Sequence, residues 1–449
     1  MKSTSSYDVC IVGAGVAGSS LAAYLGKHNL KVALIEKKWQ QPDEIIGELL
    51  QPSGVQKLVE MGFAEAFENI EAQPIQGYVM YLGNQPQQLS YPLSEGDNPY
   101  HGYGFRYGRF VQSLRSLSQD QPLVDRVEGS ATKMIENDNG EIIGIEYQNR
   151  EKGISTIHAT LTVISQGSMA SMRSSLNRSK SRTKGFMVGV VLEDTELPFA
   201  NHGHVIMADP APVLAYPVGN GKIRILIDFP SELPVMKGDA LPSYLEEVIK
   251  PQLPEVLQDS FHKAIRQQRL KGKPTHLLAS RPLVKDGAVL LGDALNMRHP
   301  TTGSGMTVAL TDVKDLGSRL TSISKFDREH IRAEVAAFYK ERHKENATVN
   351  ILAYALYRVF RHEILRVACF EYLKRGGKFS AEPMSILSGI SRSRMTLLRH
   401  FFAVAWLAVV RQLKPFPTVN KLSRSFQLIR DTLTIIIPLV RDEVPKVEA

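Results

Sequence analysis

The glycine-rich turn at residues 13–18 restricts the fold of this chain more than any other feature. A β-rich run, Asp8 to Val12, leads directly into G-A-G-V-A-G, and a helical pattern follows from Ser19 to Gly26. In such a unit the glycines allow a tight turn, a close approach of backbone to a pyrophosphate, and close packing of helix on strand. A second strand, Lys31 to Ile35, ends at Glu36, whose carboxylate can hold a ribose 2′-hydroxyl and would repel a 2′-phosphate. This order of elements predicts a Rossmann-like dinucleotide-binding unit for FAD or NAD.

A late stretch, Ala288 to Leu310, favours FAD over NAD. Val289 to Leu291 is typical of a buried strand, and Asp293 follows it, at the strand end where open α/β sheets bind ligands. The glycines at 303 and 305 predict a turn, and residues 306–316 predict a helix whose free N–H groups suit an electron-rich ring. Asp293 would then accept hydrogen bonds from ribityl hydroxyls. Taken alone, the stretch also fits a strand–turn–helix capped by Asp293 with no ligand.

Cysteine usage and the absence of metal motifs exclude several classes of site. Cys10 and Cys369 are the two cysteines, so no disulfide framework is expected, and Cys10 lies within the first predicted strand. Neither a Cys–His metal spacing nor H-E-x-x-H occurs, so the sequence predicts no metal site. No basic segment followed by an apolar core begins the chain, which predicts no secretory signal.

The net charge of +8 is concentrated in residues 373–449, which hold thirteen Lys and Arg against five Asp and Glu. The most apolar runs, His400 to Val410 and Leu433 to Val440, lie in the same region, and each is shorter than the about 20 residues that span a bilayer. Apolar runs flanked by cations, with Trp406 among them, predict helices that lie on an anionic membrane surface. A buried pair of helices is the alternative. The cations alternate with apolar runs and not with base-stacking aromatics, which argues against nucleic acid as a partner.

Several motifs resemble those of the squalene monooxygenase (squalene epoxidase) family. G-E-L-L-Q-P-S-G-V at residues 47–55 is similar to that family's G-E-x-L-Q-P-G-G segment. Residues 292–310 look like its G-D-A-x-N-M-R-H-P-x-T-G-G-G-M-T-V-A segment, and Y-P-L-S at 91–94 is similar to its Y-P-L-S-E. The resemblance extends from Tyr7 to Val440.

The resemblance implies an α/β fold with a Rossmann-like FAD-binding domain of the glutathione-reductase type. A mainly antiparallel β substrate domain would interleave with it, and a helical, membrane-associated region would follow. The FAD-binding domain is expected at 1–70, 108–180 and 281–330, the substrate domain at 71–107 and 181–280, and the helical region at 331–449. Alternation of apolar residues predicts that 155–165, 203–218 and 222–229 build the second sheet, which covers the flavin.

The resemblance also implies an activity: epoxidation of squalene to 2,3-oxidosqualene in sterol or triterpenoid biosynthesis, through a flavin hydroperoxide. FAD is the expected cofactor, with reducing equivalents passing from NADPH through a partner reductase. The protein is expected at a membrane surface, held peripherally by its C-terminal helices, and at the endoplasmic reticulum if the source is eukaryotic. A prenyl-chain reductase of the same fold and a non-catalytic FAD-fold protein that binds lipidated partners are the alternatives.

Site residues carry over position by position. The Tyr91 and Gln51 positions are implied to hydrogen-bond near the flavin, and we expect them to orient the cavity without transferring protons. The expected cofactor-binding residues are Gly13, Gly15, Val16, Ala17, Gly18, Glu36, Lys37, Glu44, Leu49, Arg109, Asp293, Gly303, Gly305 and Met306.

Departures from the family pattern carry their own expectations. Ser53 and Ser304 stand where the family usually has glycine, and Gln166 stands where flavin monooxygenases of this fold usually carry an aspartate. Because an amide lacks the charge of that carboxylate, we expect NADPH alone to reduce the flavin slowly. Tyr7 already begins the first predicted strand, so the membrane segment that precedes this strand in the animal and fungal enzymes is expected to be missing.

Overall fold

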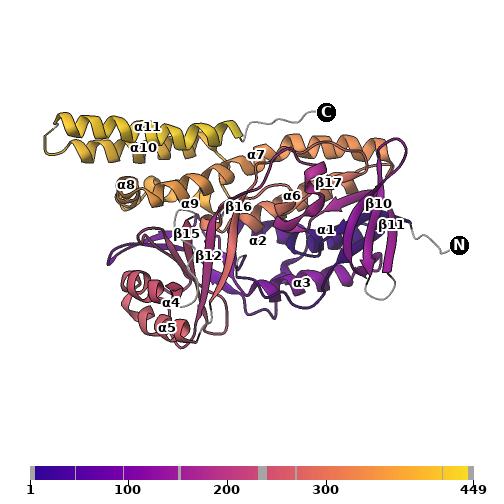
Figure 1. Ribbon diagram of the computed structural model, residues 1–449, viewed down its shortest axis with the longest axis horizontal. Helices are drawn as coiled ribbons and strands as arrows, with labels where there is room; N and C mark the ends of the chain where they lie inside the picture. The colour runs from indigo at the N-terminus through magenta and orange to yellow at the C-terminus, as the bar shows by residue number, and fades with distance from the viewer. Residues whose placement is uncertain are drawn as a thin grey trace.

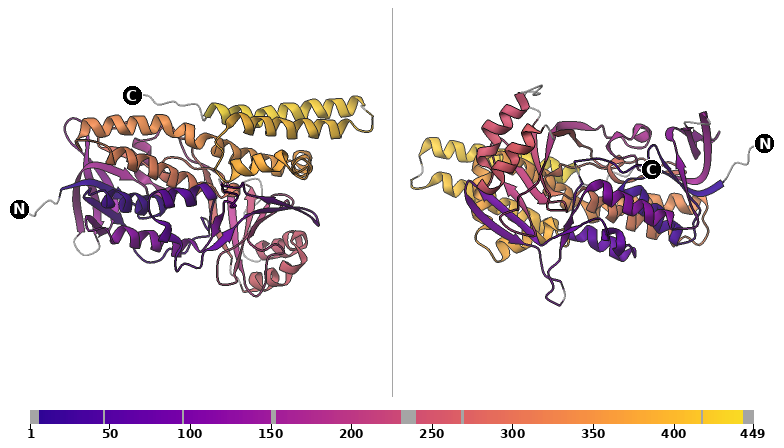
Figure 2. Two further views of the ribbon diagram at one scale, coloured as in Figure 1. Left: turned by 180° about the vertical axis from the view of Figure 1, so that it is seen from behind. Right: turned by 90° about the horizontal axis from the view of Figure 1, so that it is seen from below.

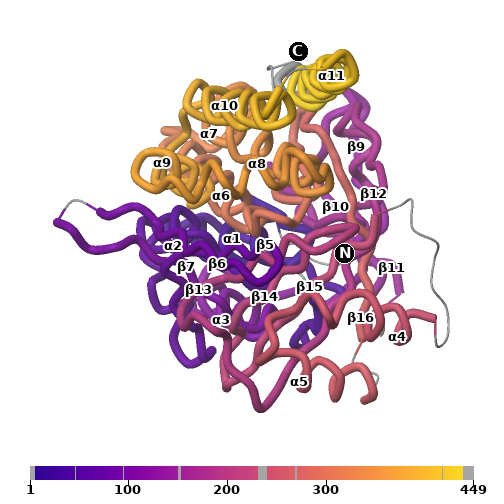
Figure 3. Tube along the Cα trace, turned by 90° about the vertical axis from the view of Figure 1, so that its left-hand side faces the viewer, coloured from indigo at the N-terminus to yellow at the C-terminus, as the bar shows by residue number. Residues whose placement is uncertain are grey.

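The structure, a computed structural model, describes residues 6–45, 47–94, 96–149, 153–230, 240–267, 270–416 and 418–442. Two large sheets lie side by side, and a stack of helices covers them (Figure 1). Seen from the end, the C-terminal helices lie on one side of the second sheet and α4 and α5 lie on the other (Figure 3). Groups of strands from one sheet alternate along the chain with groups from the other. The boundaries of the six predicted segments stay a prediction.

The predicted nucleotide-binding unit is present at the start of the chain. It consists of β1 (Ser6–Val12), α1 (Val16–Lys27) and β2 (Val32–Glu36), and β1 and β2 pair in parallel. A Cβ at Gly13 (φ +103°) would lie 2.7 Å from the Ser165 carbonyl oxygen, and one at Gly18 would lie 1.9 Å from the Gly13 carbonyl oxygen. Both positions therefore exclude a side chain, as the glycine pattern predicts.

The first sheet has the strand order β8-β2-β1-β11-β10-β9, with β17 paired to β11. Its other strands are β8 (Val124–Glu128), β9 (Ser130–Glu136), β10 (Ile142–Asn149), β11 (Gly153–Ile164) and β17 (Ala288–Leu290). α1 packs against α3 (Tyr107–Gln119) and α6 (Gly305–Thr321). Parallel pairing of β1, β2, β11 and β17 brings the carboxyl ends of four strands to one edge, where a ligand is expected.

The prediction that residues 155–165 belong to the second sheet is wrong. They form β11, which runs parallel to β1 in the first sheet. The first half of β11 alternates in burial beside the antiparallel β10, whereas its last four residues are all buried between β1 and β17. Alternation in the first half hid the strand's central position, because central parallel strands are typically apolar on both faces.

The second sheet is mainly antiparallel, with the order β16-β12-β15-β14-β13-β5-β6 and one parallel pair, β13 with β5. Its strands are β5 (Gly77–Leu82), β6 (Gln85–Ser90), β12 (Arg182–Leu192), β13 (His202–Ile206), β14 (Val213–Pro217), β15 (Ile223–Pro230) and β16 (Lys271–Leu277). Val79 and Tyr81 face a core formed with α4 (Ala240–Tyr244) and α5 (Glu255–Arg266). Tyr78 and Met80 face the C-terminal helices.

Smaller elements connect the two sheets. A three-stranded sheet of β3 (Leu49–Leu50), β7 (Gly102–Gly104) and β4 (Gln73–Ile75) precedes and follows α2 (Pro52–Glu60). Glu48, beside β3, forms a buried two-point ion pair with Arg224 of β15, at 2.6 and 3.0 Å. This pair fixes the loop before α2 against the second sheet.

From residue 328 to residue 442 the described part of the chain is mainly helical, as its pattern predicts. The helices are α7 (Arg328–Arg361), α8 (Glu363–Leu373), α9 (Lys378–Leu387), α10 (Arg394–Leu413) and α11 (Val419–Asp442). α10 and α11 pack together and extend beyond the rest of the molecule, which is clear from both sides (Figures 1 and 2). Within the described part of the chain, no helix combines the length and the apolar content needed to cross a membrane.

Candidate active site

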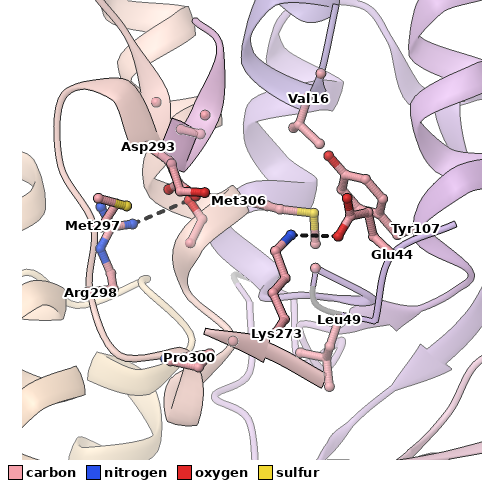
Figure 4. A pocket seen from close by; sticks show the side chains of 18 of the residues that line it. Val16, Glu44, Leu49, Tyr107, Lys273, Asp293, Met297, Arg298, Pro300 and Met306 are labelled. Carbon is pink, nitrogen blue, oxygen red and sulfur yellow. Dashed lines mark hydrogen bonds and ion pairs between the residues drawn. The ribbon is translucent and has the colours of Figure 1, made fainter. Parts of the chain in front are cut away.

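A cleft of about 460 Å³ opens where the ends of β1, β2 and β17 meet the second sheet (Figure 4). Its walls come from the glycine turn after β1, the loop before α2, the N-terminal end of α6 and strands β14 to β16. The cleft therefore lies at the strand edge that the two glycine-rich stretches predict.

Glu36 and Arg115 form one end of the cleft. The Glu36 carboxylate accepts a hydrogen bond from the Ala14 N–H at 2.8 Å, and Arg115 Nη2 lies 3.7 Å from it. Arg115 also donates through Nε to the Ala14 carbonyl at 2.8 Å and is only 5% exposed. The pair thus holds the end of β2 against the glycine turn, in position for the hydroxyls of a ribose.

Asp293 projects into the middle of the cleft from the turn after β17 (Figure 4). Its carboxylate is open to the cleft but surrounded by protein elsewhere, and this burial raises its pKa above the ordinary value. The nearby cations of Arg298, Lys273 and Arg173 oppose that rise. A carboxylate in this setting gains from accepting hydrogen bonds from hydroxyl groups of a ligand.

The N-terminal end of α6 forms the far end of the cleft. Gly303 lies in the left-handed region at φ +61°, and a Cβ there would come within 3.3 Å of Leu49. Ser304 precedes α6 but makes no capping hydrogen bond with its side chain, and its hydroxyl lies 2.8 Å from that of Thr302. The first N–H groups of α6 therefore keep their capacity to bind a ligand.

These features fit FAD. The glycine turn excludes side chains where phosphates would lie, and α1 begins there without a side-chain cap. Glu36 matches the adenosine ribose, Asp293 the ribityl chain, and the N-terminal end of α6 the isoalloxazine ring. Glu36 and Asp293 face one cleft because the carboxyl ends of β2 and β17 lie at the same edge of one sheet, with β1 and β11 between them.

A second, apolar cavity of about 120 Å³ adjoins this cleft. Aliphatic and aromatic side chains of β5, β6, β13 and the helices from α7 to α10 line it. Tyr78 and Thr301 line both cavities and form their common wall. A ligand in the apolar cavity therefore lies beside side chains that also line the cleft.

Gln51 and two tyrosines brace this common wall. Tyr91 Oη donates to Gln51 Oε1 at 2.5 Å, and Gln51 Nε2 donates to Tyr78 Oη at 2.8 Å and to the Thr302 carbonyl at 2.6 Å. Burial raises the pKa of Tyr78 to about 12 and that of Tyr91 well above its usual value, so both phenols stay neutral. This network can orient a ligand but is poorly suited to proton transfer near neutral pH.

Comparison with known proteins agrees with this geometry. The family model described as squalene epoxidase matches residues 158–426, more than half of the chain. The chain belongs to the squalene epoxidase family. A model of an NAD(P)-binding Rossmann-like domain matches residues 11–41, which include the glycine turn.

Relatives in the squalene epoxidase family match nearly the whole chain. Squalene epoxidase 3 of Arabidopsis thaliana is 39% identical over 454 residues, covering 99% of this chain and 86% of that protein. Squalene monooxygenase of Mus musculus is 37% identical, covering 97% of this chain and 78% of that protein. Both matches therefore span nearly the whole of this chain.

Solved structures share the fold at low identity. A flavoprotein/dehydrogenase from Cytophaga hutchinsonii has a TM-score of 0.71 at 17% identity and covers 91% of this chain and 99% of its own. The flavin-dependent brominase Bmp2 has a TM-score of 0.70 at 18% identity and covers 89% and 98%. This likeness confirms the predicted fold class, and with the cleft it supports FAD as the cofactor of this squalene epoxidase family member.

Most of the predicted cofactor-binding residues line the cleft. Those that do are Gly13, Gly15, Val16, Ala17, Glu36, Glu44, Leu49, Asp293, Gly303, Gly305 and Met306. Gly18 instead packs beneath the turn, Lys37 is exposed, and Arg109 pairs with Glu71 at 2.7 Å. Tyr91 and Gln51 line neither cavity and act on the common wall through Tyr78.

Arg115 and Tyr78 are among the site residues that the sequence did not predict. Val111, Arg115 and Ser118 share the buried face of α3, so a cation within that apolar stripe was the available signal. Tyr78 had no comparable signal, because a tyrosine in a strand usually only packs. Gln166, the noted departure from the usual aspartate, lines the cleft, and its Oε1 is buried with no hydrogen-bond partner within the described residues.

Proposed function

We propose that this chain is an FAD-dependent monooxygenase that converts squalene to 2,3-oxidosqualene. The observation that carries the proposal is the common wall of Tyr78 and Thr301 between the FAD cleft and the apolar cavity. An apolar polyprene in that cavity would lie next to the flavin end of the cleft. The names of the family's members, from plants and mammals, support squalene as the substrate.

The chain's own residues position the substrate and exclude water from it. When bound, reduced FAD supplies an activated form of O₂, which no side chain can supply. The aliphatic and aromatic walls exclude water from the alkene, and Gln51 fixes the common wall by holding Tyr78 and the Thr302 carbonyl. Because the pKa of Tyr78 is raised to about 12, its phenol does not ionise beside the substrate.

The test is a single turnover with labelled oxygen. Purified protein is reduced without O₂, mixed with squalene and ¹⁸O₂, and its products are analysed by mass spectrometry. We expect one ¹⁸O atom in an epoxide. A saturated, unlabelled product would assign the chain to the prenyl-chain reductases, and purified protein without bound flavin would favour a non-catalytic lipid-binding role.

We further propose that a separate reductase delivers electrons from NADPH. The only dinucleotide-binding fingerprint in the sequence would be used by FAD, with Glu36 at the adenosine ribose, and the sequence holds no second one for NADPH. Gln166 lines the cleft where a carboxylate is usual in this fold. Both features support an enzyme that does not hold NADPH itself.

We also propose that α10 and α11 attach the protein to a membrane surface. Phe402 and Trp406 of α10 are 44% and 68% exposed, and Leu422, Phe426 and Ile429 of α11 are 43% to 75% exposed. Large apolar side chains on a protruding, basic helical pair suit insertion between lipid headgroups. The side chains of residues 438–440, the end of the second predicted apolar run, lie outside the described residues.

A further inference from the structure

A hollow of about 300 Å³ lies between α8 and α10, and none of its lining residues lines the cleft or the apolar cavity. The end of each helix lines it, together with the residues that follow: 374 and 375 after α8, and 414 after α10. The lining residues are Glu371, Lys374, Arg375, Leu407, Arg411 and Lys414. Four cations and one carboxylate therefore converge on one small space.

Within the described residues none of the four cations forms an ion pair. Even Glu371, which lines the same hollow, pairs with none of them. Lys374 and Lys414 follow the last residues of α8 and α10, where a cation interacts favourably with the negative end of the helix dipole. That effect accounts for a cation at each helix end, but it does not require both ends to point their cations into the same hollow. Arg375 is also held in place, with its guanidinium 5.7 Å from the centre of the Phe379 ring.

Exposed aromatic residues lie close in sequence to two lining residues of the hollow. Trp406 is 68% exposed and precedes Leu407, and Phe416 is 76% exposed and follows Lys414 by two positions. Tryptophan and other aromatic side chains favour the depth of the lipid headgroups. If the exposed face of α10 and α11 lies in a membrane surface, the hollow lies at headgroup depth.

We propose that this hollow binds the phosphate group of an anionic membrane lipid. Two guanidinium groups can bind phosphate oxygens through paired hydrogen bonds, and two ammonium groups add point charges. Leu407 and the flanking aromatics provide apolar contacts for the adjoining acyl chains. The site rests on the proposed membrane association, and it adds a specific lipid chemistry to what would otherwise be diffuse attraction.

The test compares two double variants and one that fills the hollow. Arg411→Gln/Lys414→Gln removes two charges from the hollow, and Arg424→Gln/Arg430→Gln removes two exposed charges from α11 as the matched control. Leu407→Trp narrows the hollow and leaves every charge in place. Binding to vesicles of phosphatidylcholine, alone or with phosphatidic acid, is measured by flotation, with bound flavin and circular dichroism as checks on folding.

We expect the hollow variant to bind phosphatidic acid vesicles about tenfold more weakly than the unmodified chain, and the control to lose less. Leu407→Trp should lose most of the preference for phosphatidic acid while still binding phosphatidylcholine. Glycerol 3-phosphate should compete for the unmodified chain and not for the hollow variant.

Other outcomes would overturn the proposal. Equal losses in both double variants, with no effect of Leu407→Trp, would mean that the attraction is diffuse. Binding of inorganic phosphate without vesicles, as tight as binding of the lipid, would assign the hollow to a free anion. Failure of the unmodified chain to bind any vesicle would refute membrane association, whereas equal binding to both vesicle types would refute only the headgroup site.

Discussion

Gln51 Nε2 lies 2.8 Å from Tyr78 Oη and thereby ties the loop before α2 to the wall shared by the cleft and the apolar cavity. Tyr91 completes this tie from the other side of the amide. The amide is fully buried, so each of its hydrogen bonds constrains where Tyr78 stands.

Tyr91→Phe should therefore disturb the position of Gln51 and Tyr78 without affecting any proton transfer. The change leaves Gln51 Oε1 buried without its donor, at a cost of roughly 1–3 kcal/mol, and should loosen the common wall. We expect squalene epoxidation to fall about tenfold in kcat/KM, with normal flavin content. The pH–rate profile should keep its shape, because the pKa of Tyr91 lies well above its usual value. Loss of one limb of that profile would show that Tyr91 transfers a proton.

Asp293→Ala should yield largely colourless protein. The carboxylate is the acidic group at the middle of the cleft, and FAD that no longer binds no longer stabilises the fold. Flavin absorbance per polypeptide and the rise in Tm on adding FAD measure the effect. Asp293→Asn, which keeps an acceptor oxygen, should retain part of the flavin, and full occupancy in Asp293→Ala would refute the assignment.

NADPH without a partner should reduce the bound flavin slowly. Stopped-flow mixing, followed at the oxidised-flavin absorbance, should give a rate far below the about 1–10 per second of typical turnover. Gln166→Asp restores the carboxylate usual in this fold and serves as the comparison. Bleaching of the unmodified protein at turnover rates would show that this chain accepts hydride directly.

Stability should fall as the pH drops from about 6.5 toward 4, in part because of His204. Burial lowers the pKa of His204 from 6.5 to about 4, so the unfolded chain binds its proton first as the pH falls. The neutral, buried His204 therefore contributes to the free energy of unfolding above the pKa of the unfolded chain. About 3 kcal/mol of this contribution is lost once the pH falls below the folded pKa. His204→Asn, which retains a donor toward the His202 carbonyl, should flatten this part of a urea-unfolding series. His101→Asn, at an exposed histidine, should leave it unchanged.

Substituting serine for Trp406, Phe426 and Ile429 should release the protein from vesicles. Each exposed apolar side chain contributes up to roughly 1.5–3 kcal/mol on burial, so binding should weaken by well over tenfold. This variant is cleaner than a truncation before Met395, because Phe401 of α10 lines the apolar cavity and its removal would open the site. Serine at Val59 and Val256, which are exposed elsewhere, is the control.

Features that depend on neighbouring residues of the sequence could be predicted. Features that depend on pairing or packing between residues far apart in the sequence could not. The glycine turn, Glu36 and Asp293 each lie at or within three residues of a strand's carboxyl end, so their place at one sheet edge follows from local pattern and the geometry of parallel strands. The place of β11 depends on its pairing with β1, which alternation in its first half did not reveal. The resemblance implies Arg109 as a cofactor-binding residue, but Arg115 of the same helix lines the cleft, and only packing distinguishes the two.

The interleaving of the two sheets has a consequence for how the chain can fold. β1 ends at Val12, whereas β11, with which it pairs at the centre of the first sheet, begins at Gly153. In the second sheet β5 ends at Leu82, and its parallel partner β13 begins at His202. During synthesis β1 and β5 can pair early with β2 and β6, but the other edge of each stays open until β11 and β13 are made, which invites wrong pairing. We therefore expect slow acquisition of structure and dependence on chaperones until β17, ending at Leu290, completes the first sheet.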